Sequence, residues 1–284
     1  MNQGWLSPCR IECLGAVDNG VGGAADADSR GVAVTANATP GSDGAYTQIV
    51  AATAFDYDAI VLMLSHITSA TSQNLIDVAI GAAAAEKIIV ADLPLYALTG
   101  RYNGIRVRLP IHVPSGSRVA VRIHRSTAAS TVIDCTIHGI QSGPWSEPGF
   151  TRCTTYGTVL GSTQGTLVDP GAVAHTRGTV AQIVASTTNP IKMLYAFVQR
   201  SSGGGSNVAD DSLLLTILQG AATEKTLIPY SQFAMGATDD NWDPNLIGPY
   251  YVNLPSGTRL SAQCQSDLTL ASAREACITV LGFD

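Results

Sequence analysis

The sequence predicts an all-β protein built from two tandem β-sandwich (jelly-roll-like) domains that arose by internal duplication. The chain has 284 residues, enough for two domains that each bury a core. Short segments that alternate polar and apolar residues recur between turn residues, whereas the helical period is scarce. The same ordered set of segments also occurs in both halves, which is the mark of a repeat.

The repeat is carried by four blocks that keep their order in the two halves. The second block ends in Glu-Lys in both copies, and the third contains a Pro-Ser-Gly turn in both copies. The paired segments are 46–51 with 180–185, 76–87 with 214–225, 113–119 with 254–260, and 135–140 with 277–283. Four matching blocks in one order indicate a duplication, with longer surface loops in the second copy.

The predicted domain plan follows from this repeat. Residues 1–30 are predicted to be an N-terminal arm, because this stretch has no counterpart in the second half and much of it is rich in Gly, Ala and Asp. Residues 31–140 form the first β-sandwich and residues 165–284 the second. Residues 141–164 are the linker, since Gly and Pro punctuate this stretch.

The turn chemistry predicts how neighbouring strands connect. Arg106–Val113 and Arg118–His124 both alternate in polarity, as half-buried strands do. Pro114, Ser115 and Gly116 lie between them and supply a fixed φ followed by a flexible residue, so a hairpin is predicted here and at the matching turn of the second copy. The stretch 82–87 is compatible with a turn or with a single helical turn.

The composition argues for an assembled protein. Charged residues are only 13 % of the chain, against about 25 % in ordinary soluble domains, so much of the surface is small and uncharged and suits packing on other subunits. The net charge of −6 and the lack of Lys/Arg clusters argue against nucleic acid as a partner. Neither a long apolar window nor a basic start is present, which argues against a membrane protein and a Sec substrate.

The six cysteines form no CxxC pair and have no histidine at metal-ligand spacing, so no zinc site is expected. Synthesis in a reducing cytoplasm favours buried thiols over disulfides. A late bridge between Cys9 and Cys13 stays open.

Candidate metal ligands are few. His112, His124 and His138 lie on predicted strands of the first half and could converge as a three-His set, but the second half has no histidine at the matching positions, which favours structural roles. Asp56, Asp58 and the 239–243 segment could offer carboxylates to Ca²⁺, but they lack the spacing of a calcium loop and are read as solvated turns. No metal or cofactor is expected.

No nucleophile stands beside a base in any catalytic motif, so no catalytic residue is expected and the chain is predicted not to be an enzyme. Trp242 and Tyr250 are the candidate contacts to a partner or a glycan, because exposed aromatic side chains on sandwich loops serve such contacts. Arg118 and Arg259 recur after each turn, and each is predicted to pair with a nearby carboxylate and so to fix the hairpin.

The VPSGSRVAVRI and LPSGTRLSAQC segments, each preceded by GAAAAEK or GAATEK, resemble a pattern of duplicated β-sandwich virion structural proteins of tailed bacteriophages. The resemblance implies a component of the particle, either head decoration (cement) or tail, baseplate or fibre, made in the bacterial host cytoplasm. It also implies self-association into a homo-oligomer and contact with other virion proteins. The alternative is a lectin-like receptor-binding tail fibre protein that binds a host surface glycan. A polysaccharide hydrolase is third, and needs an acidic pair facing one cleft.

Overall fold

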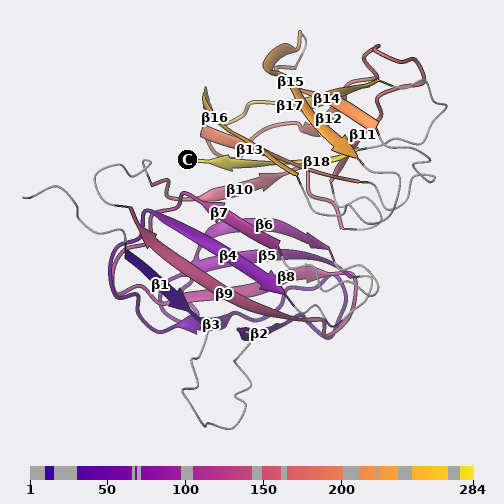
Figure 1. The fold of residues 1–284 in the computed structure, drawn as a ribbon. Coiled ribbons are helices and arrows are strands. Elements are labelled where there is room, and N and C mark those ends of the chain that lie inside the picture. The colour runs from indigo at the N-terminus through magenta and orange to yellow at the C-terminus, as the bar shows by residue number, and fades with distance from the viewer. Residues whose placement is uncertain are drawn as a thin grey trace, which may run out of the picture. The chain divides into compact units, whose positions relative to one another are not determined.

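The computed structural model describes residues 10–15, 31–65, 68, 72–96, 105–142, 149–160, 165–200, 211–221, 223–235, 245–267 and 276–284. The chain divides into two compact units, Met1–Cys153 and Thr154–Asp284 (Figure 1). The division falls inside the stretch predicted as a linker.

The first unit is a two-sheet sandwich. Its strands are β1 (Arg10–Leu14), β2 (Val32–Thr35), β3 (Thr47–Val50), β4 (Ala59–Ser65), β5 (Gln73–Ile80), β6 (Lys87–Tyr96), β7 (Ile105–Leu109), β8 (Val119–Ser126) and β9 (Val132–Gln141). One sheet has the order β2-β9-β4-β7, with β1 beside β2 on the same edge of β9. The other has the order β3-β8-β5-β6.

The second unit has the same arrangement. Its strands are β10 (Cys153–Tyr156), β11 (Thr166–Val168), β12 (Ala181–Val184), β13 (Ile191–Arg200), β14 (Asp211–Gln219), β15 (Lys225–Met235), β16 (Asn245–Leu254), β17 (Leu260–Ser266) and β18 (Ala276–Phe283). The orders are β11-β18-β13-β16, with β10 also beside β18, and β12-β17-β14-β15.

Both units therefore interleave early and late strands of the chain, which is the jelly-roll arrangement. The predicted all-β fold with two tandem jelly-roll-like sandwiches is confirmed. The duplication that would explain the shared strand order stays a prediction. Within the described residues no helix is long and apolar enough to cross a membrane.

Alternating side chains from the two sheets fill each core. In the first unit Leu62 of β4 and Ile76 and Val78 of β5 are fully buried. In the second unit Leu194, Leu215 and Ile278, from three different strands, belong to one buried cluster. A core with such period-2 packing leaves the alternate side chains of each strand for the outer face.

The predicted hairpins at the Pro-Ser-Gly turns are wrong. β7 pairs with β4, whereas β8 pairs with β3 and β5, so the turn at residues 114–117 leads from one sheet to the other. The second unit repeats this between β16 and β17. The alternation of polar and apolar residues, together with the turn residues, locates two strands joined by a turn. These signals do not determine which strands pair.

A buried threonine anchors each of these turns. The Thr53 hydroxyl donates to the Pro114 carbonyl over 2.8 Å and accepts from the Ser117 amide over 3.1 Å. In the second unit the Thr187 hydroxyl donates to the Pro255 carbonyl, and it accepts from the Thr258 amide. The two units thus repeat a contact pattern as well as a strand order.

The arginine after each turn is locked as the sequence predicts. Arg118 donates to Gln48 over 2.9 Å, to the Gly81 carbonyl over 3.2 Å and to Glu86 over 3.0 Å. Arg259 makes the equivalent bonds to Gln182, to the Gly220 carbonyl and to Glu224. Each arginine therefore ties three strands and the turn before β6 or β15 together.

Replacing either locked arginine is expected to destabilise its own unit. Arg118→Ala or Arg259→Ala removes several charge-assisted hydrogen bonds from partly buried positions and should lower the free energy of unfolding by about 2 kcal/mol. Hydrogen exchange of each unit's core amides measures the loss unit by unit. Arg106→Ala, at an exposed position of β7, is the control. Equal effects of Arg118→Ala and Arg106→Ala would contradict the lock.

The stretch 82–87 is a turn and not a helical turn: the Ala85 amide bonds the Ala82 carbonyl, and Ala84 has a φ of 65°. The second copy has one residue fewer in this turn. Ile80 pairs with Val119 and Gln219 pairs with Leu260, so the register matches Ile80 to Gln219. The predicted pairing of 76–87 with 214–225 matches Ile80 to Leu218 and is therefore wrong by one residue at this strand. A shift of one residue exchanges the two faces of a strand.

The predicted arm is wrong for residues 10–14. These residues form β1, which pairs with β9 from Arg10 opposite Gln141 to Leu14 opposite Ile137. Gly15 and Gly157, after β1 and β10, both have positive φ (77° and 82°) and lie against Ile49 and Ile183 respectively. This stretch thus has a counterpart, which the sequence comparison missed. Residues 1–9 and 16–30 of the predicted arm lie outside the described residues.

A buried tyrosine fastens β1 to the first unit. Tyr57 is fully buried, and its hydroxyl donates to the Glu12 carboxylate, which also accepts from the Ala54 amide over 2.9 Å. Burial and this hydrogen bond raise the pKa of Tyr57 far above its usual value. The ring occupies the space over Gly139, where a Cβ atom would lie 2.2 Å from the ring.

The thiols are expected to differ sharply in reactivity. Cys13 is exposed, whereas Cys135 and Cys264 are buried. Burial raises the pKa of Cys264 to about 12 and also raises the pKa of Cys135, so neither forms a thiolate readily. In a Cys9→Ser background, a thiol reagent should label Cys13 in the native protein and Cys135 and Cys264 only after unfolding, as read by peptide mass mapping. Rapid native labelling of the buried pair would contradict this. Cys9 lies outside the described residues, so its bridge to Cys13 stays a prediction.

Candidate functional site

A charged network covers the outer face of the β3-β8-β5-β6 sheet in the first unit. Asp77 of β5 is 1 % exposed, and one of its oxygens accepts from the Arg122 guanidinium at 2.8 and 2.9 Å. Its other oxygen accepts from the Asp92 amide over 2.9 Å. Both carboxylate oxygens of Asp77 are therefore engaged, and Arg122 also lies over the Tyr46 ring, 4.7 Å from its centre.

His124 extends this network toward the surface. Its Nδ1 lies 2.7 Å from Asp92, and its Nε2 lies 3.1 Å from Asp43. Each ring nitrogen of His124 therefore faces a carboxylate. The exposed edge of the network is Asp43, whose side chain is 54 % exposed.

Asp77, Asp92 and His124 lie close enough to hold a metal ion, with ligand atoms within 4.8 Å of one another. A cation at this position would have to displace Arg122 from Asp77 and would meet the positive guanidinium. The arrangement therefore fits an ion-pair network better than a metal site.

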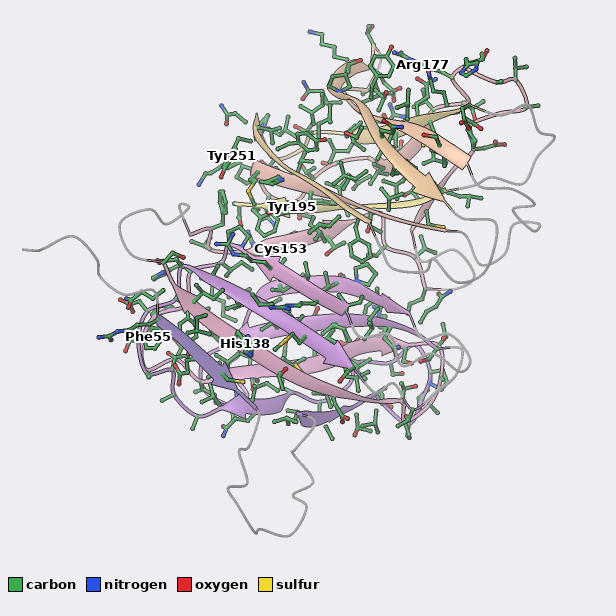
Figure 2. All side chains as sticks on the ribbon, in the orientation of Figure 1. Phe55, His138, Cys153, Arg177, Tyr195 and Tyr251 are labelled. Carbon is green, nitrogen blue, oxygen red and sulfur yellow. The ribbon has the colours of Figure 1, made fainter. Side chains whose placement is uncertain are left out.

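The three histidines named as a possible ligand set do not converge. His138 belongs to β9 in one sheet (Figure 2), His124 belongs to β8 in the other, and His112 lies in the segment between β7 and β8. Asp77 could have been noticed from the sequence as a lone acidic residue in the apolar strand LIDVAI. Its partner Arg122 could not, because strand register was unknown.

The loop residues Asp56 and Asp58 accept hydrogen bonds from backbone amides. Asp56 accepts from the Ser115 amide over 2.7 Å, and Asp58 accepts from the Ser142 amide over 2.8 Å. This agrees with the turn interpretation of these two residues. The acidic cluster at residues 239–243 lies outside the described residues.

The described residues of the second unit have no such charged network at the matching positions. Thr216 and Gln263 pair across β14 and β17 as Asp77 and Arg122 pair across β5 and β8. Arg177 stacks on the Tyr230 ring at 5.0 Å and donates to its hydroxyl. The same sheet face is therefore charged in the first unit and mostly uncharged in the second.

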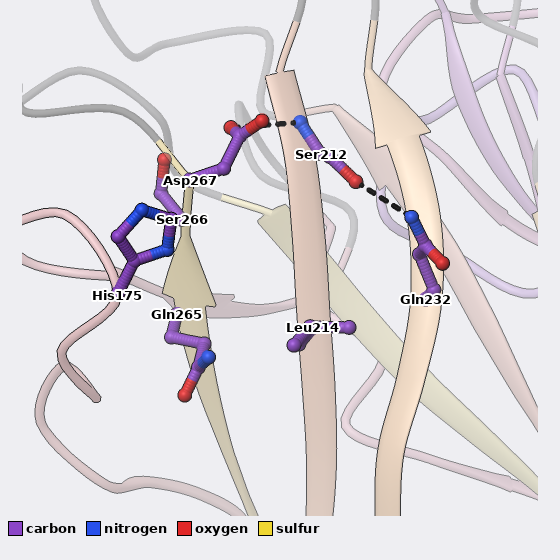
Figure 3. Close-up of a pocket in the computed structure, with 7 residues that line it drawn as sticks. All are labelled: His175, Ser212, Leu214, Gln232, Gln265, Ser266 and Asp267. Carbon is purple, nitrogen blue, oxygen red and sulfur yellow. Dashed lines mark hydrogen bonds between the residues drawn. The ribbon is translucent and has the colours of Figure 1, made fainter.

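An open hollow of about 350 Å³ lies on this mostly uncharged face (Figure 3). Strands β14, β15 and β17 and the segment before β12 supply its walls. Its described lining residues are His175, Ser212, Leu214, Gln232, Gln265, Ser266 and Asp267. We call it the β14/β17 hollow.

The hollow contains serine, histidine and aspartate, but not as a catalytic triad. The Ser212 hydroxyl accepts from the Gln232 amide over 3.0 Å, and the Ser212 backbone amide donates to Asp267 over 3.2 Å. No hydrogen bond joins the His175 ring to either serine or to Asp267 in the described part of the chain. A nucleophile needs such a bond to its base.

The two aromatic residues predicted to contact a partner or glycan have different outcomes. Trp242 lies outside the described residues. Tyr250 is half-buried, packs on the core of the second unit and shares a 2.7 Å hydrogen bond with Ser231. Its neighbour Tyr251 is 60 % exposed, so Tyr251 and not Tyr250 presents a free aromatic surface (Figure 2). Contact with a partner stays a prediction.

No family model matches the chain, and no curated protein matches its sequence. Among solved structures, the cowpea mosaic virus top component, a naturally occurring empty particle, aligns with a TM-score of 0.37 and 9 % identity over 89 % of this chain and 88 % of that one. PNGF-II aligns with a TM-score of 0.34 and 11 % identity over 89 % of this chain and 65 % of that one. The CBM22 tandem domain of Xyn10C from Paenibacillus barcinonensis aligns with a TM-score of 0.25 and 6 % identity over 98 % and 92 %. Similarities this weak assign no function.

Proposed function

We propose that the chain is a non-enzymatic structural protein of a virus particle, which self-associates and packs on other particle proteins. The observation that carries the proposal is the surface of the two sandwiches. Charged residues make up only 13 % of the whole chain, so few are available for this surface, and large apolar side chains are exposed in both units. These include Ile11, Val173 and Tyr251, which are 63, 61 and 60 % exposed.

Scattered exposed apolar residues are normal on a monomer. A surface that also carries few charged residues is less soluble, which favours its burial by other subunits. From the sequence resemblance we further propose that the particle is that of a tailed bacteriophage and that the protein acts in head decoration or in the tail or baseplate. The protein would then be made in the host cytoplasm and located in the virion.

Two measurements test this proposal. Light scattering with small-angle X-ray scattering is expected to show a defined homo-oligomer, and immunogold labelling is expected to mark intact particles. Label over the head supports decoration, and label at the tail supports a tail or baseplate role. Absence of label from every particle overturns the proposal.

A surface variant tests the role of the exposed aromatic. Tyr251→Ser is expected to shift the oligomer toward smaller species, because interface aromatics bury large areas. Lys192→Ser, an exposed position on the adjacent strand β13, is the matched control and should leave the mass unchanged.

A second candidate function is binding of a host surface glycan by the same particle protein. The β14/β17 hollow favours it, because its walls offer several uncharged hydrogen-bonding groups on an open face.

A further inference from the structure

The β14/β17 hollow differs from the matching face of the first unit in how its polar groups are used. In the first unit Arg122 donates to Asp77, and the two ring nitrogens of His124 face Asp92 and Asp43, so these polar groups are engaged within the network. In the second unit the side chain of Gln265 and the ring of His175 make no hydrogen bond within the described residues. The same scaffold therefore satisfies its polar groups internally in one unit and leaves them facing a hollow in the other.

The lining groups define the chemistry of a ligand. Gln265 and Gln232 each present an amide oxygen and an amide NH₂, although one NH₂ donor of Gln232 is used by Ser212. His175 adds an imidazole, and Leu214 adds a partly exposed apolar surface on the central strand (Figure 3). Side-chain amides both donate and accept hydrogen bonds, and so do hydroxyl groups. The lining therefore suits a ligand that carries several hydroxyl groups.

The charge of the hollow excludes an anionic ligand. None of its described lining residues is Lys or Arg, and Asp267 would repel a phosphate or carboxylate. Arg177, which lies next to the segment that lines the hollow, is already bonded to Tyr230. The volume of about 350 Å³ lies at the small end of ligand pockets, which span about 300–1,000 Å³.

We infer that the β14/β17 hollow binds a neutral saccharide, with Gln265 and Gln232 as the residues that hydrogen-bond its hydroxyl groups. The inference deepens the glycan-binding candidate by naming its site and its ligand class. It does not depend on the assembly role, which particle labelling tests separately.

The test uses the full chain and a defined set of probes. Ligand-observed NMR followed by calorimetry is carried out with the methyl glycosides of glucose, galactose, mannose and N-acetylglucosamine, and with lactose and maltose. At least one probe is expected to bind. Gln265→Leu and Gln232→Leu should each raise its Kd about tenfold, which is the loss expected for one or two hydrogen bonds.

The controls separate the site from the scaffold. Gln141→Leu makes the same replacement on β9 of the first unit and should leave Kd unchanged. Gln265→Glu keeps the size of the side chain but removes the NH₂ donor, so it should also weaken binding without unfolding the sheet. Thermal unfolding of each variant checks the fold.

Weaker binding in the hollow variants alone supports the inference. Binding that is equal in all variants overturns the site but keeps the glycan-binding candidate. No binding of any probe overturns the neutral-saccharide inference, whatever particle labelling shows.

Discussion

Gly139→Ala is expected to cost the first unit about 3 kcal/mol or more of unfolding free energy. The new Cβ would lie 2.2 to 2.4 Å from three atoms of the Tyr57 ring, which is fully buried and cannot swing away while its hydroxyl is bonded to Glu12. Overpacking of this kind typically costs about 1–3 kcal/mol, and more where nothing can move. Hydrogen exchange of the amides of β4 and β9 measures the loss.

The second unit supplies the matched control. Gly282 pairs with Leu194 of β13 as Gly139 pairs with Ile60 of β4. A Cβ there would lie 2.9 Å from Ile191 and 3.0 Å from the Tyr156 ring, a less severe overlap than the 2.2 Å at Gly139. Gly282→Ala should therefore cost about 1 kcal/mol. Equal losses at the two glycines would contradict the role given to the fixed tyrosine.

Asp77→Ala is expected to destabilise the first unit by about 3 kcal/mol. The substitution leaves Arg122, whose side chain is only 16 % exposed, without its main counter-charge, and it leaves the Asp92 amide without an acceptor. Removing one partner of a buried pair typically costs about 3–5 kcal/mol. The same exchange measurement, on β5 and β8, reports the effect.

Two variants sharpen this prediction. Asp77→Ala with Arg122→Leu removes both charges and should recover part of the lost stability, because a paired deletion leaves no buried charge alone. Thr216→Ala, at the matching position of the second unit, should cost about 1 kcal/mol or less. A double variant no more stable than Asp77→Ala would show that Arg122 does not depend on this pair.

Local signals in the sequence predicted much of the fold. Period-2 alternation and the repeated Pro-Ser-Gly turns located strands in both halves, and the repeated arginines were correctly interpreted as locks. The pairing partner of β8 was missed, because a turn next to two strands fits a hairpin and a crossing between sheets equally well. β1 was missed because only Leu14 in it is buried, so the strand has almost no apolar pattern.

The candidate sites were harder to predict, since they depend on register. Asp77 meets Arg122 only because β5 and β8 pair in one register, and the hollow gathers residues from several segments distant in sequence. The named aromatic residue Tyr250 was predicted to be exposed, but the pleat turns it onto the core and turns Tyr251 outward.

The position of β9 in its sheet limits how far the first unit can fold while the chain is still being synthesised. β9 is the last strand of the first unit to be synthesised, yet it lies between β4 on one edge and β1 and β2 on the other. Until it emerges, the β4 and β2 segments carry unused backbone donors and acceptors, which template pairing with other chains. Such late, long-range closure also slows folding. A nascent chain stalled before Val132 should therefore be captured by chaperones or aggregate, whereas one stalled well after Gln141 has every strand of that sheet in place.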